Sequence, residues 1–204
     1  MGLRSEIVGD RLFFNDGEHL FQPVLNFFVV IVGLACNFKC RDCANFVPYM
    51  PKKYYRYDVE SIIANIRIML KALSHVNHIQ IQGGEPFIYS DLGRLVEFIS
   101  QCKNVGGQVI ATNGSILPSD EVMSILRDNN VFVRISNYGL YPEKITALMD
   151  KCERFGVRFN TYDFATHEAM WYDTGGIDNL TTPPHYARRR VSRERLRHVN
   201  FKAV

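Results

Sequence analysis

Five apolar runs rich in β-branched residues alternate with four amphipathic patterns across residues 27–162, and this alternation limits the fold more than any other feature of the sequence. The first run, FFVVIVGL (27–34), is continuous, as in strands that are buried on both faces. Parallel strands joined by helical crossovers produce this order of elements. The sequence therefore predicts an α/β fold, either an open parallel sheet or a partial (β/α) barrel.

The expected elements follow from composition, periodicity and capping residues. Strands are predicted over residues 27–34, 78–82, 108–112, 131–136 and 157–162. The four helices between them are predicted to start at three polar N-caps and one proline, namely Asp58, Ser90, Ser119 and Pro142. Helical spacing in the first helix predicts one buried face, formed by Ile62, Ile63, Ile66, Met69, Leu70 and Leu73.

The chain divides into three expected regions. Residues 1–26 form an N-terminal extension, because RLFFNDGEHLF (11–21) joins two short apolar runs through Asn-Asp-Gly, which is typical of a β-hairpin turn. Residues 27–180 form the core domain. Residues 181–204 form a basic tail, which is expected to be either disordered or an aberrant terminus of a longer protein.

The charge distribution argues against nucleic acid as a partner of the core. The chain has 24 Lys and Arg against 21 Asp and Glu, a formal net charge of +3. Seven of the basic residues and one acidic residue lie in residues 185–204, which leaves 17 basic and 20 acidic residues before them. A body with a net charge of −3 lacks the basic surface that phosphate contacts need.

The N-terminal sequence MGLRSEIVGD lacks the apolar core of a signal peptide, and the longest apolar run is too short to span a bilayer. We therefore expect a cytoplasmic protein without a membrane partner. Crowded cysteines in such a compartment favour a metal or catalytic role over disulfides.

Three cysteines, Cys36, Cys40 and Cys43, follow the first predicted strand with the spacing C-x3-C-x2-C. Ligands of α/β folds collect at the carboxyl ends of the strands, so a site is expected at this loop. Three thiolates on so short a loop can hold three irons of a [4Fe–4S] cluster and leave the fourth iron open. Lys39 and Arg41 are expected to favour the thiolate form.

A structural zinc site is the alternative interpretation of the same cysteines. Closed zinc sites have four ligands, usually in two pairs that lie well apart in the sequence. His75 or His78 could supply a fourth ligand, but no second CxxC or HxxxH accompanies the loop. The cluster is preferred, and a zinc-stabilised α/β binding module stays open as the second reading.

The cysteine spacing at the end of a first strand resembles that of the radical S-adenosylmethionine (radical SAM) superfamily, and of its maturase-like members in particular. The resemblance covers about residues 27–162. It implies a [4Fe–4S] cluster held by the three cysteines, with S-adenosylmethionine on the open iron. Asp42 stands where the family often has an aromatic residue whose backbone meets the adenine, and it is expected to keep that backbone contact.

A second motif supports the resemblance. Gly83, Gly84 and Glu85 begin GGEP at the end of the second predicted strand, where glycines allow a close approach of backbone. A strand-to-helix turn of this composition is common by itself. In the family, the backbone of the corresponding motif binds the amino group of the methionine moiety, which makes these residues candidates for cofactor binding.

Two further strand ends supply candidate cofactor ligands. Thr112 and Asn113 begin TNG, which is an ordinary turn in isolation but is frequent in the family at this position. Arg134 and Ser136 are two residues apart on the fourth strand and therefore share a face. Burying the arginine requires an anion, either the methionine carboxylate or a neighbouring acidic residue.

The resemblance implies an enzyme that reductively cleaves S-adenosylmethionine to a 5′-deoxyadenosyl radical, which takes hydrogen from a substrate. A flavodoxin- or ferredoxin-like protein would donate the electron. The substrate is unknown, and a peptide, a sugar or a small metabolite is compatible. Because the family barrel has six βα units and only five strands are evident, we expect a truncated C-terminal part, and an inactive truncated fragment stays open as an alternative.

Overall fold

The computed structural model describes residues 4–40, 43–164 and 202–203, and every structural statement below concerns these residues. The strands are β1 (Arg4–Val8), β2 (Arg11–Asn15), β3 (Leu20–Phe21), β4 (Val24–Ile31), β5 (Phe38–Lys39), β6 (His75–Gln82), β7 (Gln108–Thr112), β8 (Phe132–Asn137), β9 (Phe159–Asp163) and β10 (Lys202–Ala203). The α-helices are α1 (Val59–Lys71), α2 (Leu92–Ser100), α3 (Asp120–Asp128) and α4 (Pro142–Phe155). Three short 3₁₀ helices are η1 (Val47–Tyr49), η2 (Lys52–Tyr54) and η3 (Pro86–Ile88).

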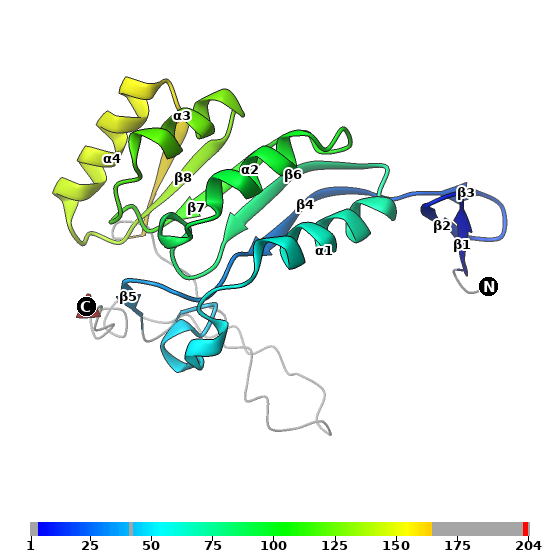
Figure 1. The fold of residues 1–204 in the computed structure, drawn as a ribbon, viewed down its shortest axis with the longest axis horizontal. Coiled ribbons are helices and arrows are strands. Elements are labelled where there is room, and N and C mark those ends of the chain that lie inside the picture. The colour runs from blue at the N-terminus through cyan, green and yellow to red at the C-terminus, as the bar shows by residue number, and fades with distance from the viewer. Residues whose placement is uncertain (1–3, 41–42, 165–201, 204) are drawn as a thin grey trace.

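The central feature is a five-stranded parallel sheet in the order β4-β6-β7-β8-β9. Helices α1 to α4 each connect two neighbouring strands and lie side by side in one layer over the sheet (Figure 1). Right-handed crossovers between successive neighbours put every helix on the same face. This arrangement confirms the predicted α/β fold of the partial-barrel type.

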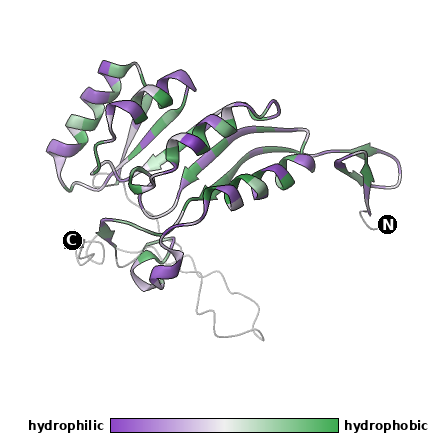
Figure 2. Cartoon of the chain, in the orientation of Figure 1, coloured by the Kyte–Doolittle hydropathy of each residue, from purple (hydrophilic) through white to green (hydrophobic). Residues whose placement is uncertain are grey.

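Residues alternate along the strands between the helix-covered face and the open face. Val133 and Ile135 of β8 are fully buried under the helices, whereas Arg134 and Ser136 lie on the other face and are half-buried. Figure 2 shows the matching pattern in the helices, whose hydrophobic residues form one side and whose hydrophilic residues form the other. The core therefore lies between the sheet and its single layer of helices.

Strand β4, the first strand of the central sheet, differs from its prediction in its bounds and in its burial. It runs from Val24 to Ile31, three residues earlier than expected, and Phe27 and Val29 are 51% and 38% exposed. The prediction of a strand buried on both faces was wrong, because β4 is an edge strand and helices cover only one of its faces. The apolar run FFVVIVGL reflects one core face and one face that is open to ligand or solvent.

Helix starts agree with the sequence prediction at three of four positions. Asp58 and Ser119 accept hydrogen bonds from the backbone N–H of Ser61 and Val122, and Pro142 opens α4. The predicted N-cap Ser90 was wrong by one residue, because Asp91 precedes α2 and its side chain accepts no capping bond.

Burial of the α1 side chains also differs from the prediction at one position. Met69 is 47% exposed, so it lies outside the buried face that helical spacing predicted for α1. Ile62, Ile63, Ile66, Leu70 and Leu73 are buried as predicted.

The N-terminal hairpin is confirmed and extended. Strands β2 and β3 pair antiparallel, and the turn between them is closed by backbone N–H groups that donate to the side chains of Asn15 and Asp16. Strand β1 adds a third antiparallel strand that the sequence reading did not predict. Figure 1 shows this small sheet at the end of the molecule opposite β5.

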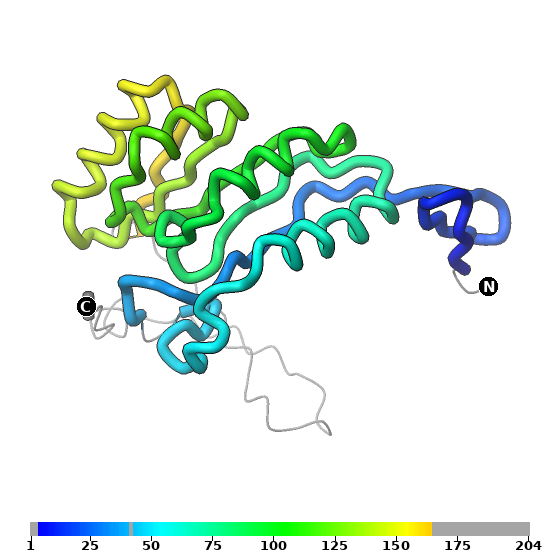
Figure 3. Tube along the Cα trace, viewed as in Figure 1, coloured from blue at the N-terminus to red at the C-terminus, as the bar shows by residue number. Residues whose placement is uncertain are grey.

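The tube trace in Figure 3 follows the chain from β4 through β5, η1 and η2 before it returns to the helix layer at α1. Lys202 and Ala203 pair antiparallel with Lys39 and Phe38 to form a two-stranded ladder. The rest of the predicted basic tail lies outside the described residues. No helix in the described ranges is long and apolar enough to cross a bilayer.

Candidate cluster and cofactor site

Three motif-bearing loops meet at one edge of the sheet because β4, β6 and β7 are parallel neighbours. The cysteine loop follows β4, the GGEP loop follows β6, and the TNG loop follows β7. The structure thus brings together all three motifs that sequence analysis singled out, at the carboxyl ends of the strands where ligands of such sheets bind.

Backbone hydrogen bonds hold the segment that leads into the cysteine loop from two sides. On one side, Gly84 N and Glu85 N donate to Gly33 O and Ala35 O at 2.9 and 2.8 Å. On the other side, Ala35 N donates to Tyr55 O at 3.0 Å. The cysteine loop is therefore attached both to the GGEP loop and to the segment after η2.

This attachment explains the paired glycines. A Cβ at Gly83 would lie under 3.0 Å from Gly33 O, and a Cβ at Gly84 would lie under 3.0 Å from Ala35 O. Glycine was expected here because of a close ligand. The structure shows that the close neighbour is the backbone before the cysteines, which leaves no room for a side chain.

Cys36, Cys40 and Cys43 are free thiols, and each is half-buried. Burial is the main cause that raises the pKa of Cys36 to about 12, with smaller contributions from the charges of Glu85, Cys40 and Cys43. Burial, with a smaller contribution from Cys43, raises the pKa of Cys40 to about 11. Both pKa values lie above the ordinary value of a thiol, opposite to the thiolate-favouring effect expected of Lys39; Arg41 lies outside the described residues. Metal binding must therefore displace protons from these thiols.

The donor chemistry fits an iron–sulfur cluster. The three thiols belong to one loop of eight residues, and the charges of Cys40 and Cys43 contribute to the raised pKa of Cys36. Thiolates are the ligands that such clusters use. Within the described ranges, no three His, Cys, Asp or Glu side chains converge as ligands of a single metal ion.

Tyr138, which sequence reasoning missed, lies close enough to the cysteine loop for the charges of the cysteines to act on it. Burial raises the pKa of its hydroxyl, and the charges of all three cysteines raise it further, whereas a hydrogen bond with Ser136 lowers it. Its ring stacks on Phe164 with centroids 5.0 Å apart. The chain brings Tyr138 here because it follows β8 at the same edge of the sheet, a placement that a lone Tyr in a loop does not reveal.

Glu85 and Thr112 bind each other in the interior. Both residues are 2% exposed, and Thr112 Oγ1 donates to Glu85 Oε1 at 2.7 Å. Backbone N–H groups of Phe87 and Asn113 donate to the two Glu85 oxygens at 3.1 and 2.9 Å. These side chains join the GGEP loop to the TNG loop and do not reach open space.

Burial raises the pKa of Glu85 to about 7, against the opposing effect of its three hydrogen bonds. The carboxyl is therefore partly protonated near neutral pH, whereas an ordinary Glu would be fully ionised.

Asn113 lies beside the cysteine loop. Its Nδ2 donates to Asn37 Oδ1 at 3.1 Å and to Cys36 Sγ at 3.8 Å. Asn37 and Ser115 complete this group of polar side chains, and neither was among the predicted site residues. Asn37 stands within the cysteine motif itself, so a polar residue next to Cys36 was the only signal in the sequence.

Arg134 and Ser136 lie on the open face of β8 as their spacing predicted. Within the described part of the chain, no carboxylate lies at ion-pair distance from Arg134, so the alternative of a neighbouring acidic partner has no support there. Asp42 lies outside the described residues.

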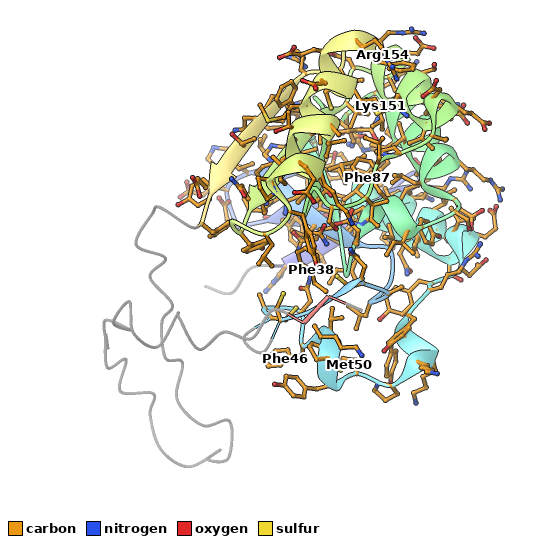
Figure 4. The ribbon with its side chains drawn as sticks, turned by 90° about the vertical axis from the view of Figure 1, so that its left-hand side faces the viewer. Phe38, Phe46, Met50, Phe87, Lys151 and Arg154 are labelled. Atoms are coloured by element: carbon orange, nitrogen blue, oxygen red, sulfur yellow. The ribbon has the colours of Figure 1, made fainter. Side chains whose placement is uncertain are left out.

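The outer part of the loop is more exposed. Figure 4 shows Phe38 between the sheet and the segment that carries Phe46 and Met50. Phe38 is 4% exposed, and its ring lies 6.1 Å from that of Tyr141, whereas Phe46 is 59% exposed. Asn45 Nδ2 donates to Gly83 O at 2.6 Å and ties this segment back to the GGEP loop.

The fold and the site together define a class of protein, the cluster-binding partial barrel. Its features here are a parallel α/β sheet and three thiols in a C-x3-C-x2-C loop, which faces two glycine-containing loops at the carboxyl edge of the sheet. The sequence model of the Radical SAM superfamily matches residues 30–170. The chain belongs to this superfamily, whose members use a [4Fe–4S] cluster and S-adenosylmethionine.

Relatives with assigned names share part of the chain. The protein is 29% identical over 99 residues to GTP 3′,8-cyclase of Campylobacter jejuni subsp. doylei. The aligned region covers 48% of this chain and 30% of that enzyme. It is 27% identical over 131 residues to GTP 3′,8-cyclase of Aquifex aeolicus, which covers 61% of this chain and 38% of that enzyme. The chain thus spans about a third of the length of these curated relatives.

The solved structure of BtrN in complex with AdoMet and 2-DOIA is similar in fold. It superposes with a TM-score of 0.54 at 16% identity and covers 71% of this chain and 59% of BtrN. Identity at this level supports the shared fold and leaves the substrate open.

Proposed function

We propose that the protein is a radical SAM enzyme that holds a [4Fe–4S] cluster through Cys36, Cys40 and Cys43. The observation that carries the proposal is the meeting of the cysteine, GGEP and TNG loops at one sheet edge, joined by direct hydrogen bonds. Chance clustering of cysteines in a core would not place all three motifs of one family around one position.

When bound and reduced, the cluster supplies one electron that breaks the sulfonium C–S bond of S-adenosylmethionine, giving methionine and a 5′-deoxyadenosyl radical that takes a hydrogen atom from the substrate. The chain's own residues bind and orient. The backbone of Gly83, Gly84 and Glu85 is proposed to face the methionine amino group. Arg134 is proposed to bind the carboxylate, because a half-buried cation on the open face needs an anion.

The helix-free face of the sheet is the proposed binding surface for S-adenosylmethionine and substrate. It carries exposed apolar side chains such as Phe27 and Val29 beside polar ones such as Gln82, a mixture that is typical of ligand sites. Ser136 and Asn113 lie near this face and are proposed to contact the cofactor or to support its binding. A flavodoxin- or ferredoxin-like cytoplasmic protein is the proposed electron donor.

Anaerobic reconstitution with iron and sulfide tests the proposal. We expect about four irons per chain, and formation of 5′-deoxyadenosine after reduction with dithionite in the presence of S-adenosylmethionine. Cys40→Ser should lose both, whereas Cys102→Ser, which removes a half-buried thiol two residues after α2, should keep both. One tightly bound zinc and no iron would overturn the proposal, and iron without cleavage would show that this chain binds the cluster without turnover.

A further inference from the structure

The side chains of Asn37, Asn113 and Ser115 form a closed ring of hydrogen bonds beside the cysteine loop. Asn113 Nδ2 donates to Asn37 Oδ1 at 3.1 Å, and Asn37 Nδ2 donates to Ser115 Oγ at 2.7 Å. Ser115 Oγ donates to Asn113 Oδ1 at 2.5 Å. Each group in the ring gives one hydrogen and receives one, so the three side chains orient one another.

The hydrogen bonds that Asn113 Oδ1 accepts determine which end of the Asn113 amide faces Cys36. Asn113 Oδ1 accepts from both the hydroxyl and the backbone N–H of Ser115, the latter at 2.9 Å. The amide nitrogen must therefore lie on the opposite side. One of its two hydrogens is donated to Asn37. The second is donated to Cys36 Sγ, with 3.8 Å between Nδ2 and Sγ.

The backbone of Asn113 is held independently of its side chain. Asn113 N donates to the buried carboxylate of Glu85 at 2.9 Å, and Gly114 N donates to Thr112 Oγ1 at 3.0 Å. The donor is thus attached to the rigid end of β7 and not to the cysteine loop itself. Cys36 Sγ also accepts from Phe38 N at 3.3 Å, so it has two donors from two different segments.

We propose that Asn113 is a positioning residue that sets the reduction potential of the cluster through its hydrogen bond to the sulfur of Cys36. The proposal rests on the cluster assignment above. Reduction adds one negative charge to a cluster whose sulfur ligands share that charge, and a hydrogen-bond donor stabilises the more negative state. The amide thereby makes the cluster easier to reduce, in addition to any contact that Asn113 makes with S-adenosylmethionine.

The test is a redox titration of the reconstituted cluster, followed by electron paramagnetic resonance without S-adenosylmethionine. Asn113→Leu keeps the branched shape of the side chain and removes the donor, and its midpoint potential should shift to a more negative value. Ser115→Ala is the matched comparison, because it breaks the ring while the Ser115 backbone N–H still orients Asn113. Its potential should equal that of the unaltered protein.

The outcomes separate the two proposals. If the unaltered protein takes up no iron, the cluster assignment itself fails. If Asn113→Leu binds a normal complement of iron and titrates at the unaltered potential, or if Ser115→Ala shifts the potential as far as Asn113→Leu does, the role of Asn113 is overturned and the assignment stands.

A second measurement covers the case in which Asn113→Leu cannot hold a cluster. Pulsed paramagnetic resonance on protein carrying ¹⁵N in its asparagine side chains should show a nitrogen coupled to the reduced cluster, and Asn37→Ala should keep that coupling. Absence of the coupling from the unaltered protein, or its loss in Asn37→Ala, would overturn the proposal.

Discussion

Thr112 Oγ1 donates a 2.7 Å hydrogen bond to Glu85 Oε1, and this buried pair joins two loops that lie one βα unit apart. Sequence analysis placed both residues in the cofactor site. The structure uses their side chains to hold the loops that form the site, so their effects on ligand binding are expected to be indirect.

Glu85→Gln is expected to destabilise the fold at pH 5. The protonated carboxyl can still accept the backbone N–H of Asn113 through its hydroxyl oxygen, whereas an amide NH₂ cannot accept it. A buried donor without an acceptor costs about 1–3 kcal/mol. Urea denaturation of the metal-free chain measures the loss.

Glu97→Gln is the matched control for this substitution, since Glu97 is exposed on α2. Its free energy of unfolding should stay within about 0.5 kcal/mol of the unaltered value. Equal stability of Glu85→Gln and the control at pH 5 would contradict the assigned role of the Glu85 oxygens.

The stability difference between the unaltered protein and Glu85→Gln is expected to shrink as the pH rises. The folded pKa of Glu85 is about 7, above its ordinary value of 4.5, so folding favours the protonated form. The stability that protonated Glu85 contributes to the fold is present in full below the unfolded pKa and is lost as pH rises through the folded pKa. Denaturation at pH 5, 6, 7 and 8 should show that the unaltered protein loses about 3 kcal/mol of unfolding free energy relative to Glu85→Gln. This loss should be complete slightly above pH 7.

Gly83→Ala is expected to disrupt the contact between the GGEP loop and the segment before the cysteines. The new methyl group would lie against Gly33 O, a backbone atom that cannot rotate away. Overpacking of this kind costs about 1–3 kcal/mol, and the reconstituted protein should also bind less iron. Thermal unfolding and iron content give the two readouts.

Gly107→Ala serves as the comparison, because its Cβ would meet only Asn77 O, at an ordinary 3.8 Å. It should unfold and bind iron as the unaltered protein does. If the two alanine variants behave alike, the close approach at Gly83 does not limit the fold.

Arg134→Leu is expected to weaken binding of S-adenosylmethionine to the reconstituted protein. A charge-assisted hydrogen bond is worth about 1.5–3 kcal/mol, so the dissociation constant should rise roughly 10- to 100-fold. The metal-free stability should not fall, since no described carboxylate pairs with this cation. Calorimetric titration with S-adenosylmethionine tests the assignment, with Arg127→Leu, a surface variant on α3, as the control. Unchanged affinity for Arg134→Leu would refute it.

Local patterns in the sequence were sufficient to predict the alternating strands and helices. Apolar spacing predicted all four α-helices, and Asp58, Ser119 and Pro142 were identified correctly as their start signals. The exposed face of β4 was not predicted, because a run of apolar residues looks the same whether helices cover one face of a strand or both.

The motif residues could be assigned to one site, but their contacts could not. Asn37, Asn113 and Ser115 come from loops that follow different strands, and only the parallel pairing of those strands brings them together. Likewise, no local signal indicates that Gly84 faces Ala35. Such contacts depend on the register of the whole sheet, which single-sequence patterns do not specify.

The single layer of helices has a consequence for how this protein can change over time. In β8, Val133 and Ile135 support the core, whereas Arg134 and Ser136 on the intervening positions do not. Mutations at the first pair are therefore filtered by folding, whereas mutations at the second pair are expected to be filtered by the proposed ligand contacts. One strand thus carries two nearly independent sets of positions, so the residues of the open face can change while the scaffold stays intact.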